Sequence, residues 1–207
     1  MTTIYLVRHG ETEWNHTNRY QGDRDVPLNA KGKEQAGKIG DRLRKVKLDA
    51  IYSSDLGRAA ETARAINEGR NLPFFMRQGL REMNYGLWEG LTLDEITAKY
   101  LPAWLAYRED SLNTCVPEGE GYRDVLARVR QVMNEIAQIH PDGTVALVGH
   151  AGSLRAVIYN ALGFDPRERW RLRLANVSLS IVTYGDRVGE LILFNDTCHL
   201  DDTPLEG

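Results

Sequence analysis

The sequence has little of what builds disulfide frameworks, membrane spans or nucleic-acid-binding surfaces. Its 207 residues include only two cysteines, Cys115 and Cys198, whose wide separation indicates neither a disulfide nor a metal site. We expect both to be small, buried apolar side chains. No apolar run approaches the length of a membrane span, and residues 1–7 lack the features of a signal peptide. With a formal net charge of −3 there is no general basic field, so we predict a cytoplasmic protein without nucleic-acid or membrane partners.

Several common catalytic signatures are missing as well. The sequence contains no GxxxxGK[ST], GxGxxG, HExxH or GxSxG pattern, which makes nucleotide-binding, zinc-protease and serine-hydrolase chemistry poor fits. The five histidines are widely separated and show no short metal-ligand spacing. We therefore expect chemistry that uses neither a metal nor a cofactor.

No repeat, low-complexity tract or linker interrupts the chain, and we predict a single domain over residues 1–207. Strand-like and helix-like patterns alternate along it. The predicted strands are residues 2–7, 48–52, 73–76, 144–148, 177–184 and 190–194; the predicted helices contain residues 36–46, 58–66, 92–108, 125–136 and 154–162. Ser53, Ser54 and Asp55 are candidate N-caps for the second helix. This order predicts an α/β fold, a three-layer sandwich with a mainly parallel central sheet.

Basic and imidazole side chains follow several of these strands. Arg8 and His9 follow the first strand, His150 follows residues 144–148, and Arg58 lies in the first turn of a helix that follows a strand. Because ligands of open α/β sheets bind at the carboxyl ends of the strands, we expect these four residues to converge. One such histidine alone would more often be structural, and one such arginine would more often be solvated.

Two guanidiniums and two imidazoles, beside a helix N-terminus with open N–H groups, would suit a phosphoryl dianion. Without a metal to generate hydroxide, phosphoryl transfer needs a protein nucleophile, and a neutral imidazole is available at pH 7. His9 is our candidate for that role.

Four sequence motifs follow one another along the chain. The first is residues 8–12 (RHGET), with Asn15 and residues 19–22 (RYQG), and the second is residues 53–59 (SSDLGRA). The third is Glu82 followed by residues 86–90 (GLWEG), and the fourth is residues 149–152 (GHAG). Together they resemble the histidine phosphatase superfamily, which includes phosphoglycerate mutases. The resemblance extends over roughly residues 3 to 200 and implies a phosphoglycerate mutase-like fold. One departure is residues 117–121 (PEGEG), where the family often has Pro-x-Gly-Glu-Ser, so a hydroxyl contact near the substrate entrance is expected to be missing.

The resemblance also implies roles for individual residues. His9 would become a phosphohistidine, Arg8, Arg58 and His150 would hold the transferred group, and Glu82 would be the proton donor. Physical chemistry agrees, because phosphoryl transfer depends mainly on positioning and on neutralising charge on the equatorial oxygens. Substrate or phosphate contacts are implied for Asn15, Gln21, Gly22, Ala151 and Gly152.

Glu82 has two possible interpretations, one catalytic and one without a catalytic role. To donate a proton it would have to be kept protonated, and we expect Tyr85, Leu87 and Trp88 to provide an apolar neighbourhood that does so. The alternative is a surface carboxylate in a loop.

The middle of the chain favours a phosphatase over a mutase. As the resemblance has it, dedicated phosphoglycerate mutases are longer and carry a basic insertion, whereas residues 91–116 are short and contain only Lys99 and Arg108 as cations. Trp104 and Tyr107 in this segment either contact an apolar leaving group or form helix core. The motifs look most like the broad-specificity phosphatase and α-ribazole phosphatase branch, with a small phosphorylated molecule as substrate.

Other interpretations stay open at this stage. A cofactor-dependent phosphoglycerate mutase is one alternative. A non-catalytic phosphometabolite-binding protein is another, although it would be expected to lack one of the five residues given catalytic roles. A homodimer is an open alternative to a monomer.

Overall fold

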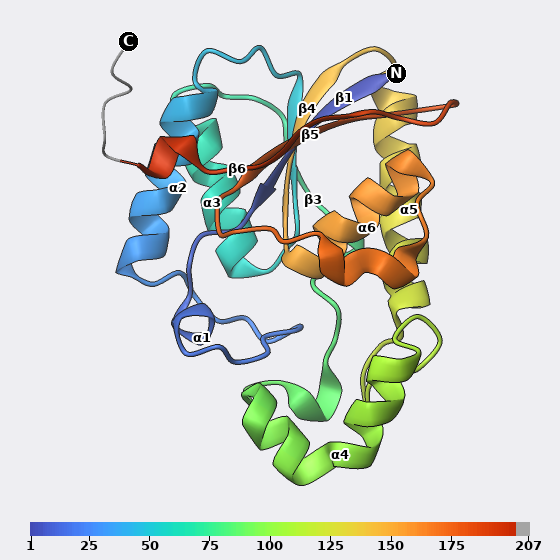
Figure 1. Cartoon of the computed structure of the whole chain (residues 1–207). Coiled ribbons are helices and arrows are strands. Elements are labelled where there is room, and N and C mark those ends of the chain that lie inside the picture. The colour runs from blue at the N-terminus through green and yellow to red at the C-terminus, as the bar shows by residue number, and fades with distance from the viewer. Residues whose placement is uncertain (202–207) are drawn as a thin grey trace.

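A six-stranded sheet forms the centre of the computed structural model, which describes residues 1–201 apart from the side chains of residues 168 and 169 (Figure 1). In spatial order the strands are β3 (Phe74–Met76), β2 (Ala50–Ser53), β4 (Thr144–Gly149), β1 (Thr2–Arg8), β5 (Leu179–Tyr184) and β6 (Leu191–Asp196). The first four run parallel, β5 pairs antiparallel with β1, and β6 pairs antiparallel with β5. The predicted α/β fold with a mainly parallel sheet is confirmed.

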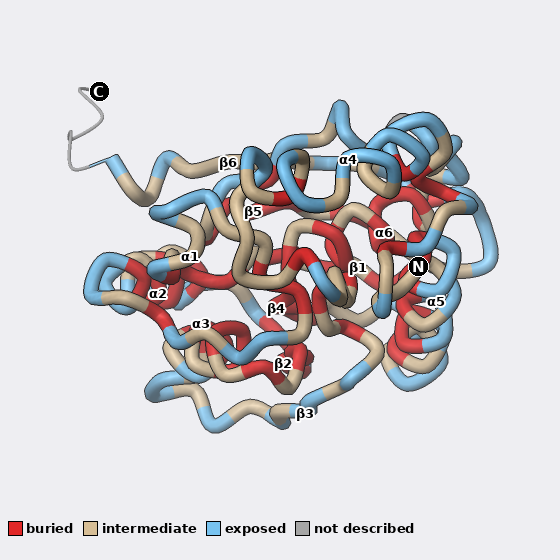
Figure 2. Tube along the Cα trace, turned by 90° about the horizontal axis from the view of Figure 1, so that it is seen from below, coloured by how far each residue is buried: buried red, intermediate tan, exposed pale blue. Residues whose placement is uncertain are grey.

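Helices cover both faces of this sheet because the side chains of its central strands are apolar on both sides. On one face, α2 (Ala30–Leu43) and α3 (Gly57–Asn67) form a core cluster with Val7; on the other, α5 (Tyr122–Ile139) and α6 (Ala151–Leu162) share a cluster with Ile4 and Leu6. Figure 2 shows the buried strands between these two helix pairs. The result is the expected three-layer arrangement.

The register of the two central strands brings their carboxyl ends together. Leu6 pairs with Leu147 and Arg8 pairs with Gly149, so His9 and His150 are each the next residue along. The backbone N–H of His9 continues the pairing by donating to the Gly149 carbonyl oxygen at 3.0 Å. Strand pairing therefore sets the proximity of two histidines that are far apart in the sequence.

The remaining helices are shorter or irregular. Both α1 (Glu13–His16) and α4 (Leu93–Glu109) lie beyond the end of the sheet toward which β1 points (Figure 1). Helix α4 begins with a capping box formed by Thr92 and Glu95 and is kinked at Tyr100, two residues before Pro102. The 3₁₀ helices are η1 (Gln78–Leu80), η2 (Gly86–Trp88), η3 (Pro166–Arg171) and η4 (Cys198–Leu200).

Some predicted boundaries and caps were wrong. Helix α6 begins at Ala151, directly after His150, rather than at Leu154. Strand β5 begins at Leu179 rather than at Val177, because Val177 has a left-handed backbone with φ +48°. The Ser53–Asp55 segment does not cap α3. Its N-cap is Leu56, and the amide of Gly57 instead donates to the Asp25 carboxylate at 2.7 Å. A carboxylate from a distant loop thus replaces the local cap.

The expectation for the cysteines was also wrong. Both Cys115 and Cys198 are exposed, because Cys115 lies in the connection between α4 and α5 and Cys198 is the first residue of the short 3₁₀ helix η4. Within residues 1–201 no helix is long and apolar enough to cross a bilayer.

Candidate active site

A cavity of about 220 Å³ opens at the carboxyl end of the parallel strands. Its lining in the described chain consists of Arg8, His9, Asn15, Asn18, Arg19, Tyr20, Gln21, Arg58, Glu82 and Tyr85. These residues come from β1, α1 and the loop that follows it, the start of α3, and the segment before η2. Most residues to which the sequence gave a role in catalysis or binding therefore lie around one cavity.

The orientation of His9 is set by its own neighbour. Its Nδ1 lies 2.7 Å from the carbonyl oxygen of Gly10, and because a carbonyl can only accept, Nδ1 carries the proton. Burial lowers the pKa of His9 well below its usual value, with further lowering from the charges of Arg58 and Arg8. The ring is therefore neutral at pH 7, and Nε2 carries the lone pair.

His150 lies beside His9, with 5.0 Å between the ring centroids and an angle of 56° between the rings. It is fully buried, and neither ring nitrogen has a hydrogen-bond partner among residues 1–201. Burial, then Arg58 and the neighbouring His9, lower the pKa of His150 well below its usual value. Its surroundings in the protein alone therefore favour the neutral form of His150. Buried polar atoms without partners are rare. An anion bound beside His9 would accept from one of these two nitrogens when that nitrogen is protonated.

The two arginines are held by loop carbonyls. Arg58 donates to the carbonyl oxygens of Gly22 at 2.8 Å and Arg24 at 2.6 Å, and Arg8 donates to that of Leu174 at 2.7 Å. In the part of the chain that the structure describes, the Nε of each arginine has no partner. Burial lowers the pKa of Arg8 to about 10 and also lowers the pKa of Arg58, so both stay charged at pH 7. The site is thus locally cationic in a protein of net negative charge.

Glu82 lies opposite these cations in a more polar setting than expected. Its two carboxylate oxygens accept from the backbone N–H of Gly152 at 3.0 and 3.1 Å, and one of them also accepts from that of Met83 at 2.9 Å. Of the three expected apolar neighbours, Tyr85 lines the same cavity as Glu82, whereas Leu87 is exposed and Trp88 packs against other aromatic rings. The Gly152 amide, predicted to be open for phosphate, is occupied by Glu82.

The smaller polar residues form a connected group. Thr12 caps α1, and Asn15 lies in this short helix. The Thr12 hydroxyl lies 3.1 Å from Asn15 Oδ1 and 3.0 Å from Gln21 Oε1. Gly22 has φ +54°, and a Cβ there would lie 2.0 Å from a carboxylate oxygen of Glu89, so only glycine fits.

Not all predicted contacts reach the cavity. Four predicted site residues lie outside the lining formed by the described residues: His150, Gly22, Ala151 and Gly152. His150 packs against the ring of His9, and Gly22 supports Arg58 through its carbonyl. Gly121, at the position of the expected family serine, is the N-cap of α5 and is likewise outside this lining.

Sequence reasoning missed Tyr20 as a wall residue, although it lies within a quoted motif, and it expected Tyr85 only as an apolar neighbour of Glu82. The rings of Tyr20 and Tyr85 meet edge to face at 5.0 Å. Burial raises the pKa of Tyr20 to about 12, and burial followed by the charge of Glu82 raises the pKa of Tyr85 well above its usual value. Both hydroxyls therefore stay protonated and can donate. Trp104 and Tyr107 pack against Trp88 at 5.6 and 5.3 Å, which supports the helix-core alternative for that segment.

The chain was compared with known proteins on the basis of both sequence and fold. A family model described as histidine phosphatase superfamily (branch 1) matches residues 4–197. The chain belongs to this family. Over 206 residues it is 34% identical to phosphoserine phosphatase 1 of Hydrogenobacter thermophilus, covering 100% of this chain and 98% of the relative. It is 32% identical over 211 residues to the probable phosphoglycerate mutase GpmB of Erwinia tasmaniensis, with the same coverage.

The solved structures agree with the family assignment. YhfR of Bacillus stearothermophilus matches with a TM-score of 0.90 and 33% identity, covering 97% of this chain and 100% of that chain. The phosphoglycerate mutase-like fold is confirmed, and the protein is an enzyme of the histidine phosphatase family.

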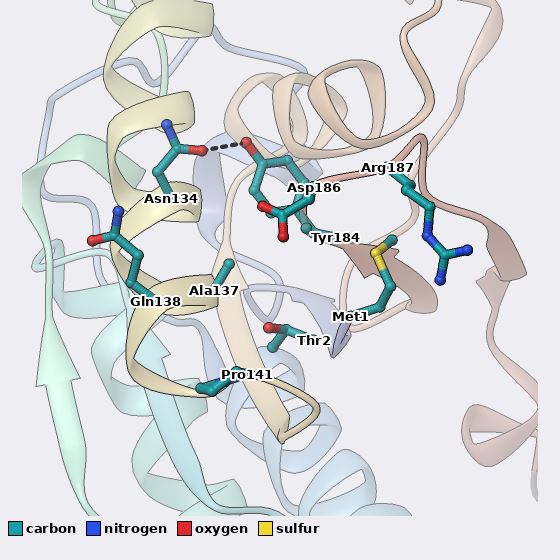
Figure 3. Close-up of a pocket in the computed structure, with 10 residues that line it drawn as sticks. Met1, Thr2, Asn134, Ala137, Gln138, Pro141, Tyr184, Asp186 and Arg187 are labelled. Carbon is teal, nitrogen blue, oxygen red and sulfur yellow. Dashed lines mark hydrogen bonds between the residues drawn. The ribbon is translucent and has the colours of Figure 1, made fainter.

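A larger cavity, of about 560 Å³, lies away from this histidine phosphatase site, where β1 begins (Figure 3). Met1, Thr2 and Arg187 line it, together with Tyr184, whose hydroxyl donates to Asn134 Oδ1 at 2.6 Å. The predicted catalytic residues are not part of this lining in the described chain. Cavity size alone would have selected the wrong end of the sheet.

Proposed function

We propose that this protein is a metal-independent phosphomonoesterase that hydrolyses small phosphorylated metabolites through a phosphohistidine on His9. The observation that carries the proposal is the fixed His9 ring. Because Nδ1 donates to Gly10, the nucleophilic Nε2 is available beside Arg8, Arg58 and His150.

In the first step, Nε2 of His9 attacks phosphorus as the bond to the leaving oxygen breaks. Arg8 and Arg58 neutralise charge on the equatorial oxygens, and their fixed guanidiniums need no reorganisation during the step. A bound phosphoryl dianion would also favour the protonated form of His150, which would then donate to it.

Glu82 handles the proton. In its protonated form it gives that proton to the departing alkoxide, and the resulting carboxylate then takes a proton from the water that attacks the phosphohistidine. Phosphate leaves, His9 returns to its neutral form, and Glu82 is again protonated. The two Gly152 hydrogen bonds hold this carboxyl group in place through both steps.

The cavity supports a small substrate and water as the phosphoryl acceptor. Its volume of about 220 Å³ is below the roughly 300–1,000 Å³ of typical ligand pockets. The third lining cation of the described chain, Arg19, is paired with Glu95 at 2.7 Å and donates to the Gly90 carbonyl at 2.6 Å. It is therefore poorly placed to bind the second charge of a bisphosphate, as a mutase cycle would require.

The test is to trap and identify the intermediate. Brief incubation with a ³²P-labelled phosphomonoester should give an acid-labile, base-stable adduct, and His9→Ala should abolish both the adduct and turnover. Activity should survive chelators. Restoration of a chelated enzyme only by added divalent metal would contradict the proposal.

Products and leaving groups separate the remaining alternatives. With 3-phosphoglycerate the enzyme should release phosphate, whereas efficient conversion to 2-phosphoglycerate would identify a mutase. Glu82→Gln should slow alkyl phosphates by about 10²- to 10⁴-fold while largely sparing aryl phosphates, whose leaving groups need little protonation. Equal slowing of both classes would remove Glu82 from the role of proton donor.

A further inference from the structure

The segment between η3 and β5 is tied to the candidate active site at several points. Arg8 donates to the Leu174 carbonyl at 2.7 Å. The next residue is held from outside the site, because the side-chain oxygen of Asn195 in β6 accepts from the amide of Ala175 at 2.7 Å. At the end of the segment, Asn176 Nδ2 donates to the backbone oxygen of His9 at 3.0 Å and to Asn15 Oδ1 at 3.2 Å. Asn176 itself does not line the cavity in the described chain.

We propose that Asn176 is a positioning residue, which sets the side-chain orientation of Asn15 and the backbone of His9 for phosphoryl transfer. This inference rests on the proposed function, because it assigns Asn15 a donor role toward the phosphoryl group.

The orientation of Asn15 depends on the donors around its oxygen. Oδ1 accepts from the backbone N–H of Thr12 at 3.1 Å and from Asn176 Nδ2 at 3.2 Å. The Thr12 hydroxyl also lies 3.1 Å away, but it has one proton and an alternative acceptor in Gln21 Oε1 at 3.0 Å. When that proton goes to Gln21, Asn176 supplies half of the remaining donors.

With Oδ1 held in this way, the NH₂ group of Asn15 is left for the cavity, which Asn15 lines. The opposite orientation would present a carbonyl oxygen to the phosphoryl oxygens and repel them. Losing Asn176 should therefore loosen the position of the Asn15 side chain and let its carbonyl oxygen, instead of its NH₂ group, face the phosphoryl group.

The next residue supports the same interpretation. Val177 is fully buried and β-branched, yet it has a left-handed backbone with φ +48°. Its N–H donates to the Arg8 carbonyl oxygen at 3.0 Å. Such a conformation persists only where the surroundings enforce it, and such residues cluster at active sites. Here it turns the chain so that Asn176 meets His9 before β5 begins.

The experiment compares Asn176→Ala and Asn176→Leu with wild type, using p-nitrophenyl phosphate for turnover and orthovanadate for binding by calorimetry. Leucine keeps the size of asparagine without its donors, and the half-buried position should allow both variants to fold, as checked by thermal melting. We expect kcat to fall by about 10- to 100-fold in each, with a smaller change in KM, because the attacking ring and Asn15 are misplaced.

A matched control is Asn195→Gly. It removes the hydrogen bond to Ala175 in the same segment but touches neither His9 nor Asn15, and glycine tolerates the φ of +53° at this position. Its kcat should stay within about threefold of wild type. An equal loss in this control would show that any loosening of the segment is enough, and would overturn the proposal.

A double-mutant cycle distinguishes positioning from general structure. In an Asn15→Ala background, Asn176→Ala should cost far less in kcat and in orthovanadate affinity than it does alone. The same cost in both backgrounds, or a loss in kcat below about threefold in the single variant, would overturn the proposal. If wild type forms no phosphohistidine, the proposed function fails; the orthovanadate arm of the cycle still tests the coupling between Asn176 and Asn15.

Discussion

Replacing Gly152 by alanine should disable Glu82 without removing any side chain from the site. A Cβ built on Gly152 would lie 2.2 Å from Glu82 Oε1 and 3.2 Å from its Cδ. The first distance is far inside van der Waals contact. The carboxyl group must therefore swing away, and both hydrogen bonds from the Gly152 amide, at 3.0 and 3.1 Å, are lost or weakened.

The size of the effect follows from what those bonds do. A hydrogen bond contributes about 0.5–1.5 kcal/mol when its partner is neutral and about 1.5–3 kcal/mol when its partner is charged, so in either protonation state the original position of Glu82 is no longer favoured. A displaced proton donor loses much of the roughly 10²- to 10⁴-fold rate acceleration that general acid catalysis supplies. We expect at least about a 10²-fold fall in kcat for an alkyl phosphate. For p-nitrophenyl phosphate, whose leaving group needs little protonation, the fall should be less than about tenfold.

The assay measures kcat for both substrates in Gly152→Ala, in Glu82→Gln and in a control glycine variant. Gly37→Ala is suited to be that control, because Gly37 is exposed on α2 and, apart from its own helix backbone, no atom of the described chain lies within 4 Å of the new Cβ. It should keep full activity and gain about 0.5–1 kcal/mol of stability. Alkyl phosphatase activity of Gly152→Ala within threefold of wild type, or equal slowing of both substrates, would refute the reasoning.

Two further predictions concern the buried charges. In phosphate-free buffer the free energy of unfolding should fall as the pH drops from 6.5 to 5, because the pKa values of His9 and His150 are lowered in the fold and the unfolded chain therefore binds more protons. The slope of the free energy of unfolding against pH should approach about 1.4 kcal/mol per pH unit for each histidine. Urea denaturation at a series of pH values should show a shallower slope for His150→Asn. A wild-type free energy of unfolding that does not change over this pH range would contradict the lowered pKa values. Arg58→Lys should lower kcat by about 10²-fold, because lysine keeps the charge but cannot donate to the Gly22 and Arg24 carbonyls while also facing the site. A near-normal kcat with p-nitrophenyl phosphate would show that only the positive charge of Arg58 matters.

The sequence could predict the convergence of His9, His150 and Arg58, because apolar strand patterns and their polar ends are local signals. It could not predict how the site is braced. Leu174 and Asn176 lie in an irregular segment with no periodicity, and the hydrogen bonds that join their backbone or side-chain atoms to Arg8 and His9 arise only from tertiary packing.

Other features could not be predicted from the sequence, for related physical reasons. The cap of α3 comes from Asp25, and no local pattern reports a carboxylate supplied from 32 positions away. The cysteines were assigned by residue type alone, which ignores where each lies: Cys115 is in a connection and Cys198 begins η4, and both are exposed. The single domain over residues 1–207, the cytoplasmic location and the homodimer stay predictions.

The burial of the site explains why its charges are arranged as they are. Removing water lowers the pKa of both histidines and of both arginines, so a dry cavity by itself opposes positive charge. The arginines remain cationic, and the carboxyl group of Glu82 and the loop carbonyls lie close enough to compensate them. Among the residues that the structure describes, none is hydrogen-bonded to Nε2 of His9, and the ring stays neutral, as a nucleophile must. The same desolvation that keeps the imidazole uncharged thus strengthens the interaction of the two guanidiniums with charge that develops on a transferred phosphoryl group.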